Sequence, residues 1–188
     1  MKHHQEFSKF EIIPSIRKLN NFDAACNSGA DYVLLTEASI SNLQMLVRRV
    51  HESGKKAWVN PELLGGFDCD HEGAKLLHNL YHVDGVMSTD TRTLSLVKRQ
   101  DIYTIQRFFV TDSRAFETAL KVLDKSPADC AEILPAFSAL EVYHELKRKT
   151  DLPLLAGGFI KNEEMLEKIR EIGYNGVTVS EKRLWPEK

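Results

Sequence analysis

The sequence predicts a compact α/β barrel of the TIM (β/α)8 type with a reduced final helix. Three observations predict this fold. Short β-rich segments alternate with longer helical segments, eight such units follow one another at about 23 residues each, and no linker or low-complexity tract separates them. Repeating β-then-α units favour parallel strands joined by crossover helices, so a single domain over 1–188 is expected. An open doubly wound sheet is the structural alternative.

The eight expected strands are short runs of β-branched, aromatic and aliphatic residues. They lie in order at 12–16, 32–36, 56–60, 85–88, 103–109, 131–135, 153–157 and 176–180. Apolar runs of this length are typical of strands buried in a parallel sheet. The tail after position 180 leaves room for barely one helical turn, which is why the final helix is expected to be reduced.

Helical patterns fill the seven intervals between these strands. They cover 21–29, 41–54, 70–82, 91–100, 112–126, 138–150 and 162–173. Several open on Ser, Asp, Thr or Asn, which are preferred at helix N-caps, and three end on glycine. In the last segment apolar residues recur at spacings of three and four from Met165 to Ile172, so one face is expected to cover the sheet.

The composition limits the classes of function. The chain has 188 residues, 43% of them hydrophobic and 28% charged, and a net charge of −2, so contact with RNA would require a local basic patch. No apolar run approaches the roughly 20 residues of a membrane span, and the polar start lacks the apolar core of a signal peptide. We therefore expect a cytoplasmic protein with no membrane partner.

Metal and cofactor motifs are weak. The cysteines at 26, 69 and 130 are odd in number and form no Cys-x-x-Cys pair, which favours reduced thiols over a disulfide framework or a zinc site. His78 and His82 lack a third ligand, and capping of the next helix explains most of the acidic loop 67–73, with a divalent cation as the alternative. No serine-hydrolase, P-loop or dinucleotide-binding motif occurs. We predict no metal and no cofactor.

Candidate ligand-binding residues follow from the fold, because the functional face of a TIM barrel lies where each strand runs into the next helix. The polar or glycine residues at those strand ends that we select are Arg17, Ser88, Arg107, Glu132, Gly157, Gly158 and Ser180. Gly157 and Gly158 end the seventh strand and are expected to open a helix whose free N–H groups can hold an anion. Phosphate sites on this fold usually follow strands seven and eight, although a tight β–α turn is the alternative.

Gln106 and Arg107 lie at the centre of the strand at 103–109, whose other residues are aromatic or β-branched. A cation there needs an anionic partner, which is either Glu132 on the next strand or a bound phosphate, and the two interpretations are compatible. Neighbouring side chains on a strand point to opposite faces. Gln106 is therefore expected to face the helix layer and to be structural.

Basic residues cluster late in the expected helices, at 48–49, 55–56, 98–99 and 147–149. The helix dipole favours cations at these ends, so solvated helix termini are the simplest interpretation. In a barrel the same ends gather on the face opposite the ligand, where they could form a positive surface. No aromatic residues of the kind used for single-strand stacking are interleaved with them.

An ordered set of motifs resembles one protein family. These are DGVMST (84–89), TIQRFF (104–109) followed by DS, EILP (132–135), AGGFI (156–160) and a final VS with Trp185. In order and spacing they resemble the glycerol-3-phosphate-responsive antiterminators of bacterial glycerol uptake operons, over roughly 12–185. The resemblance implies a compact TIM barrel that is not an enzyme. It implies a regulator that binds the leader mRNA of glycerol genes when glycerol 3-phosphate is present and so prevents early termination of transcription.

Matched position by position, the resemblance points to Arg107, Glu132, Gly157, Gly158 and Ser180, which are also candidates chosen from the residues alone. The chain departs from the family pattern at 60–63, where a His-x-Asp-Leu segment is expected, and at position 90, where an aspartate replaces an expected lysine beside the anion site.

Two alternatives stay open at this point. One is an enzyme acting on a phosphorylated polyol or sugar, with Glu132 or Glu62 as general base. The other is a diverged relative that has lost the ligand or the RNA. A homodimer is the commonest closed assembly and is also left open.

Overall fold

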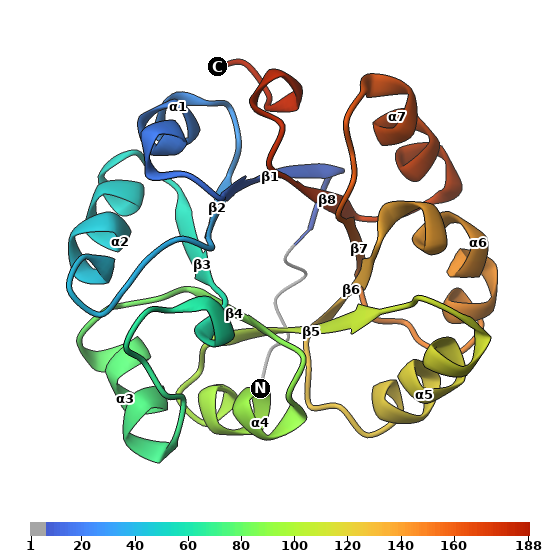
Figure 1. The fold of residues 1–188 in the computed structure, drawn as a ribbon, viewed down its shortest axis with the longest axis horizontal. Coiled ribbons are helices and arrows are strands. Elements are labelled where there is room, and N and C mark those ends of the chain that lie inside the picture. Colours follow the sequence, from blue (N-terminus) through green and yellow to red (C-terminus); the bar gives the residue numbers. More distant parts are fainter. Residues whose placement is uncertain (1–6) are drawn as a thin grey trace.

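The computed structural model describes residues 7–188, which form a closed barrel of eight parallel strands surrounded by helices (Figure 1). Each strand pairs with its neighbour in sequence, and β8 (Gly176–Val179) closes the barrel by pairing with β1 (Glu11–Ile16). The predicted TIM-type barrel is therefore confirmed.

The strands lie close to their predicted positions. Between β1 and β8 these are β2 (Tyr32–Leu35), β3 (Lys56–Val59), β4 (Gly85–Ser88), β5 (Tyr103–Phe109), β6 (Cys130–Leu134) and β7 (Leu154–Gly157). We call the face at which the strands end the upper face, and the face at which they begin the lower face.

Seven α-helices and three 3-10 helices occur in the described part of the chain. The α-helices are α1 (Phe22–Asn27), α2 (Leu43–Glu52), α3 (His71–Asn79), α4 (Thr91–Lys98), α5 (Ser113–Leu123), α6 (Ala136–Lys147) and α7 (Glu163–Ile172). The 3-10 helices are η1 (Leu19–Asn21), η2 (Pro61–Leu63) and η3 (Lys182–Leu184). Only η3 follows β8, as predicted for a reduced final helix.

Side-chain caps fix where most helices begin. Asp70, Asp90, Asp112 and Asn162 each accept a hydrogen bond from a backbone N–H in the first turn of the helix that follows. Helix α6 differs, because it begins directly after Pro135, two residues before the predicted start at 138. A proline has its φ angle already set near the helical value, so a helix can begin beside it without a side-chain cap.

Apolar residues fill the barrel interior as well as the space between strands and helices. The interior cluster includes Ile13, Trp58, Met87 and Ile105, whereas a second layer joins the outward side chains to the helices. Phe7 closes the lower end and packs against Tyr32, Trp58 and Tyr103. Since side chains alternate along a strand, residues two positions beyond an interior residue also point inward and can reach the upper mouth of the barrel.

No helix among residues 7–188 is long and apolar enough to cross a membrane.

Candidate functional site

A buried ion pair lies at the upper ends of β5 and β6. Nε of Arg107 lies 2.6 Å from Oε2 of Glu132, whose side chain is fully buried. The hydroxyl of Thr178 on β8 donates to the other carboxylate oxygen at 2.5 Å. Arg107 and Glu132 stand opposite each other in the parallel register of β5 and β6, so the structure shows the Glu132 pairing, which is one of the two interpretations that the sequence leaves open. Both oxygens of this buried carboxylate therefore have donors, as burial of a charge requires.

The ion pair orients Arg107 without using all of its donors. Only Nε bonds to a described residue, and the two terminal nitrogens of the guanidinium have no acceptor among residues 7–188. The side chain is 12% exposed, and its guanidinium lies 5.6 Å from the ring centre of Phe109. Arg107 is thus held in place on one side and available to an anion on the other.

Gly157 makes room for the Glu132–Thr178 hydrogen bond. A Cβ atom at this position would lie 2.5 Å from Oγ1 of Thr178 and 2.7 Å from Oε1 of Glu132. Neither neighbour is free to move, because Thr178 and Glu132 are bonded to each other and Glu132 is also held by Arg107. Glycine is therefore required here by close approach of side chains.

The loop after β7 has an unusual backbone. Gly158 and Phe159 both have positive φ angles, of 78° and 61°, and a bulky residue in this region is strained. No described residue accepts a hydrogen bond from the backbone N–H of Gly158, Phe159 or Ile160. Helix α7 begins at Glu163 with Asn162 as its cap, close to the predicted range 162–173, so a loop separates the glycine pair from the first turn of the helix. The groups available to an anion are those of the loop.

Arg17 and Ser180 complete one arc of the upper mouth. Both are exposed, and neither side chain bonds to a described residue. Ser180 lies two positions beyond Thr178 and so has the same strand parity. Arg17 directly follows β1 and Ser180 directly follows β8, and β1, β8 and β7 are consecutive around the barrel, so both residues lie on the same side of the mouth as Gly157.

Ser88 belongs to a separate cluster. Its hydroxyl donates to Glu62 at 2.6 Å, and the same carboxylate oxygen accepts from the backbone N–H and the hydroxyl of Thr89 at 2.7 and 2.9 Å. Asn60 in turn accepts from the N–H of Glu62. The structure therefore does not bring the Ser88 side chain to the Arg107–Glu132 pair, because Glu62 holds it.

The side chain of Gln106 connects β5 to the end of β4 and to the loop before β6. Its Nε2 donates to the carbonyls of Thr89 and Ser88 at 2.9 and 3.3 Å, and its Oε1 accepts from the hydroxyl of Ser126 at 3.0 Å. The side chain is 1% exposed. The predicted structural role of Gln106 is confirmed. Its hydrogen bonds explain why a polar residue occupies a buried strand.

Asp90 caps α4. Its carboxylate accepts from the N–H groups of Arg92 and Thr93 and from the hydroxyl of Thr93, at 2.9, 3.3 and 3.1 Å. The negative charge that replaces an expected lysine thus interacts with the positive end of a helix dipole.

Replacing Asp90 by alanine should lower the free energy of unfolding by about 1 kcal/mol, since the cap is lost. Asp90→Lys should lower it further, because a cation would then lie at the positive helix end. Urea denaturation measures both, with Asp90→Asn as the control that keeps one cap oxygen. An alanine variant as stable as the wild type would contradict the capping role.

The three cysteines are free thiols. Burial raises the pKa of Cys69 to about 12, with smaller contributions from Asp68, Asp70 and Asp90. Burial also raises the pKa of Cys130, and the negative charge of Glu132 adds to this effect. These thiols are therefore protonated near neutral pH and poorly nucleophilic. Within residues 7–188 no three His, Cys, Asp or Glu side chains are grouped so that they could hold a metal ion.

Sequence reasoning missed Thr178 and the role of Glu62 as an anchor. Strand parity was the available signal for Thr178, because it lies on β8 two positions before Ser180 and shares its face. The Glu62 contacts depend on how the loop after β3 folds over β4, for which the sequence carries no periodic signal.

Comparisons with known proteins identify the family of the chain and its fold. A family model described as "Glycerol-3-phosphate responsive antiterminator" matches residues 12–185. The solved glycerol uptake operon antiterminator regulatory protein from Listeria monocytogenes is 28% identical and superposes with a TM-score of 0.89, over 96% of this chain and 97% of that one. The glycerol uptake operon antiterminator-related protein from Thermotoga maritima is 22% identical, with a TM-score of 0.81 over 94% and 98% of the two chains, and shares the fold.

One curated relative is the uncharacterized protein YgcP of Escherichia coli K12, which is 24% identical over 93% of this chain and 91% of its own length.

Proposed function

Because the chain belongs to the family of glycerol-3-phosphate responsive antiterminators, we propose that it is a cytosolic, non-enzymatic regulator that binds glycerol 3-phosphate on its upper face. In the bound state it engages the leader mRNA of glycerol uptake genes and prevents early termination of their transcription. The observation that carries this proposal is Arg107, which is fixed by a buried carboxylate and leaves its terminal nitrogens uncommitted at the mouth of the barrel.

The ligand has two chemical parts, a phosphate dianion and a glycerol with two hydroxyls. We assign the phosphate to the free N–H groups of Gly158, Phe159 and Ile160, with Ser180 and Arg17 beside them. Arg107 binds the ligand on the side facing away from this loop. Its planar guanidinium can make two parallel hydrogen bonds to phosphate oxygens. Ser88 contributes to the shape of the site rather than to contacts, because Glu62 occupies its hydroxyl.

An enzymatic role is less well supported than regulation. A general base needs a carboxylate that is free to accept a proton from the substrate. Both oxygens of Glu132 are engaged by Arg107 and Thr178, and one oxygen of Glu62 accepts three hydrogen bonds. Glu132 therefore links β5 to β8, and Glu62 links the loop after β3 to the end of β4.

Ligand control requires two states of the protein. Glycerol 3-phosphate shifts the population only if it binds the RNA-competent state more tightly than the other, since equal affinity shifts nothing. The strained Phe159, which belongs to the proposed phosphate loop and has a 71% exposed side chain, is the residue most directly placed to respond.

Calorimetric titration tests the ligand, with glycerol and inorganic phosphate as controls. We expect saturable binding of glycerol 3-phosphate, no binding of glycerol, and weaker binding of phosphate. Fluorescence anisotropy with a labelled leader RNA then tests the response, and we expect tighter RNA binding when the ester is present. Absence of ester binding by the folded protein would leave a diverged relative as the better description.

A further inference from the structure

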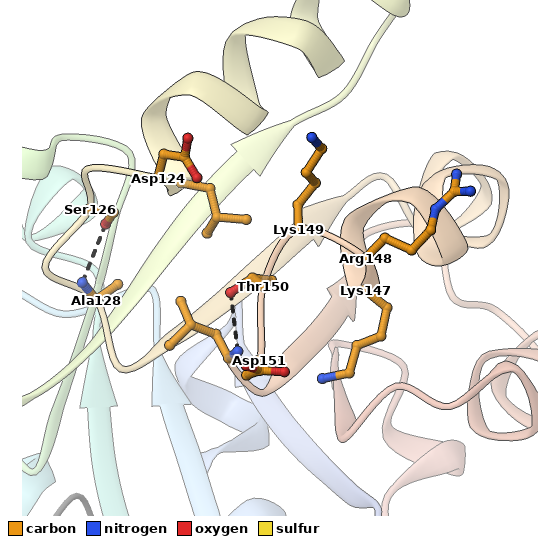
Figure 2. Close-up of a pocket in the computed structure, with 10 residues that line it drawn as sticks. Asp124, Ser126, Ala128, Lys147, Arg148, Lys149, Thr150 and Asp151 are labelled. Atoms are coloured by element: carbon orange, nitrogen blue, oxygen red, sulfur yellow. Dashed lines mark hydrogen bonds between the residues drawn. The ribbon is translucent and has the colours of Figure 1, made fainter.

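A groove with a volume of about 420 Å³ lies between the ends of α5 and α6 (Figure 2). It is lined by Leu123, Asp124, Ser126, Ala128 and residues 147–152, and we call it the basic groove. Ala128 and Leu152 lie just before the starts of β6 and β7. The basic groove is therefore on the lower face, opposite the Arg107–Glu132 pair.

The cations of the basic groove have no partners in the part of the chain that the structure describes. Lys147, Arg148 and Lys149 are exposed and form no ion pair or side-chain hydrogen bond with any residue from 7 to 188. Other helical cations do form such pairs, for example Lys75 with Glu72 and Lys168 with Glu164. An external anion could bind in the basic groove without breaking an internal salt bridge.

The helix dipole explains only part of this cluster. The last turns of α3, α4, α5 and α7 each contain one basic residue, at positions 78, 98, 121 and 170. Helix α6 has His144 and Lys147 in its last turn, and Arg148 and Lys149 follow beyond its end. The last turn of α2 also contains two basic residues, and Arg148 is the C-cap residue of α6, so the dipole, whose effect falls off within the last turn, leaves only the third consecutive cation, Lys149, unexplained.

Local charge at the groove is opposite in sign to that of the chain. Lys125 lies beside the lining residues and brings the cations to four, against the two carboxylates Asp124 and Asp151, in a chain of formal net charge −2. Neither carboxylate forms an ion pair with the groove lysines. A positive patch on a net acidic chain concentrates anion binding at that patch.

The directions of the cations indicate the kind of anion. In Figure 2 the Lys149 side chain points up beside Asp124, Arg148 points away to the right, and Lys147 points down. A single phosphate would need donors that converge on one point, whereas these are spread along an edge. Spread point charges suit a polymer whose phosphates recur along a backbone.

We propose that the basic groove binds the phosphate backbone of RNA, so that ligand and RNA occupy opposite faces of the barrel. The inference rests on the proposed function and adds the place where RNA is held. One wall of the basic groove is hydrogen-bonded to β5, the strand that carries Arg107, because the hydroxyl of Ser126 donates to Gln106. Strand β5 thus contacts both sites.

The test is the salt dependence of RNA binding, measured by fluorescence anisotropy with glycerol 3-phosphate present. The probe is a labelled single-stranded leader RNA, and the variant carries Lys147→Ala, Arg148→Ala and Lys149→Ala. We expect affinity to fall about tenfold or more, and the slope of log K against log salt to decrease in magnitude by about 2, because each lost phosphate contact on a single strand removes about 0.7.

A matched control removes three cations elsewhere, with Arg48→Ala, Lys75→Ala and Lys168→Ala on α2, α3 and α7. It changes net charge equally and should keep wild-type affinity and slope to within about twofold. Calorimetry should give unchanged glycerol 3-phosphate binding in both variants. If the groove variant keeps the RNA affinity and the salt slope of the wild type, the basic groove is not the RNA site, and the proposed function still stands. If the wild-type protein binds no RNA at low salt, both the RNA-binding groove and the proposed function are contradicted.

Discussion

Arg107→Ala is expected to lower the affinity for glycerol 3-phosphate by about 100-fold or more. The variant removes the charge-assisted hydrogen bonds of the guanidinium, which together are worth about 3 kcal/mol. It also leaves Glu132 buried without its cation, which should lower the free energy of unfolding by about 3–5 kcal/mol. Calorimetry measures the first effect, and urea denaturation the second.

A second variant separates binding from folding. Arg107→Lys keeps a positive charge beside Glu132 but lacks the planar fork, so it should retain most of the stability and still bind the ester at least about tenfold more weakly. Arg92→Ala is the control, because Arg92 is exposed on α4 and its side chain contacts no described partner. Wild-type affinity in both folded Arg107 variants would remove this residue from the site.

Gly157→Ala is expected to lower the free energy of unfolding by about 3 kcal/mol and to abolish ligand binding. The added methyl would overlap the Thr178 hydroxyl and the Glu132 carboxylate, which lie 2.5 and 2.7 Å from its position. Overpacking of a fixed interior site and loss of a buried polar network both destabilise the folded state. Adding Thr178→Ala removes the nearest atom and should restore part of the stability.

Gly54→Ala provides the comparison for Gly157. Gly54 has a φ of 77° and no atom within 4 Å of the added methyl, so only backbone strain of about 1–2 kcal/mol is expected. Equal urea midpoints for the two variants would mean that close approach at Gly157 is not what selects glycine there.

Much of the fold and part of the site follow from sequence periodicity. The alternation of strands and helices predicts the barrel, and strand parity places Gln106 and Arg107 on opposite sides of β5. Consecutive strands are neighbours in such a barrel, which predicts the contact between Arg107 and Glu132. These features depend on regular backbone geometry, and regular geometry leaves a pattern in the sequence.

The features that could not be predicted lie in loops or depend on atomic distances. The five residues between Gly157 and the start of α7 carry no periodic signal, so the strained backbone at Phe159 was not foreseen. Glu62 reaches Ser88 through the fold of the loop after β3. Asp90 stands where the family pattern has a lysine beside the anion site, although its place directly before the helix predicted at 91–100 is typical of an N-cap.

The hydrogen bonds of Gln106 have a thermodynamic consequence for a regulator. One side chain contacts loop carbonyls at the upper end of β4 and Ser126 at the wall of the basic groove. If glycerol 3-phosphate raises the affinity for RNA through this strand, RNA must raise the affinity for glycerol 3-phosphate by the same factor, because the coupling free energy is a property of the pair. A transcript bound by the protein would then retain its inducer, which prolongs the signal after the free inducer concentration falls.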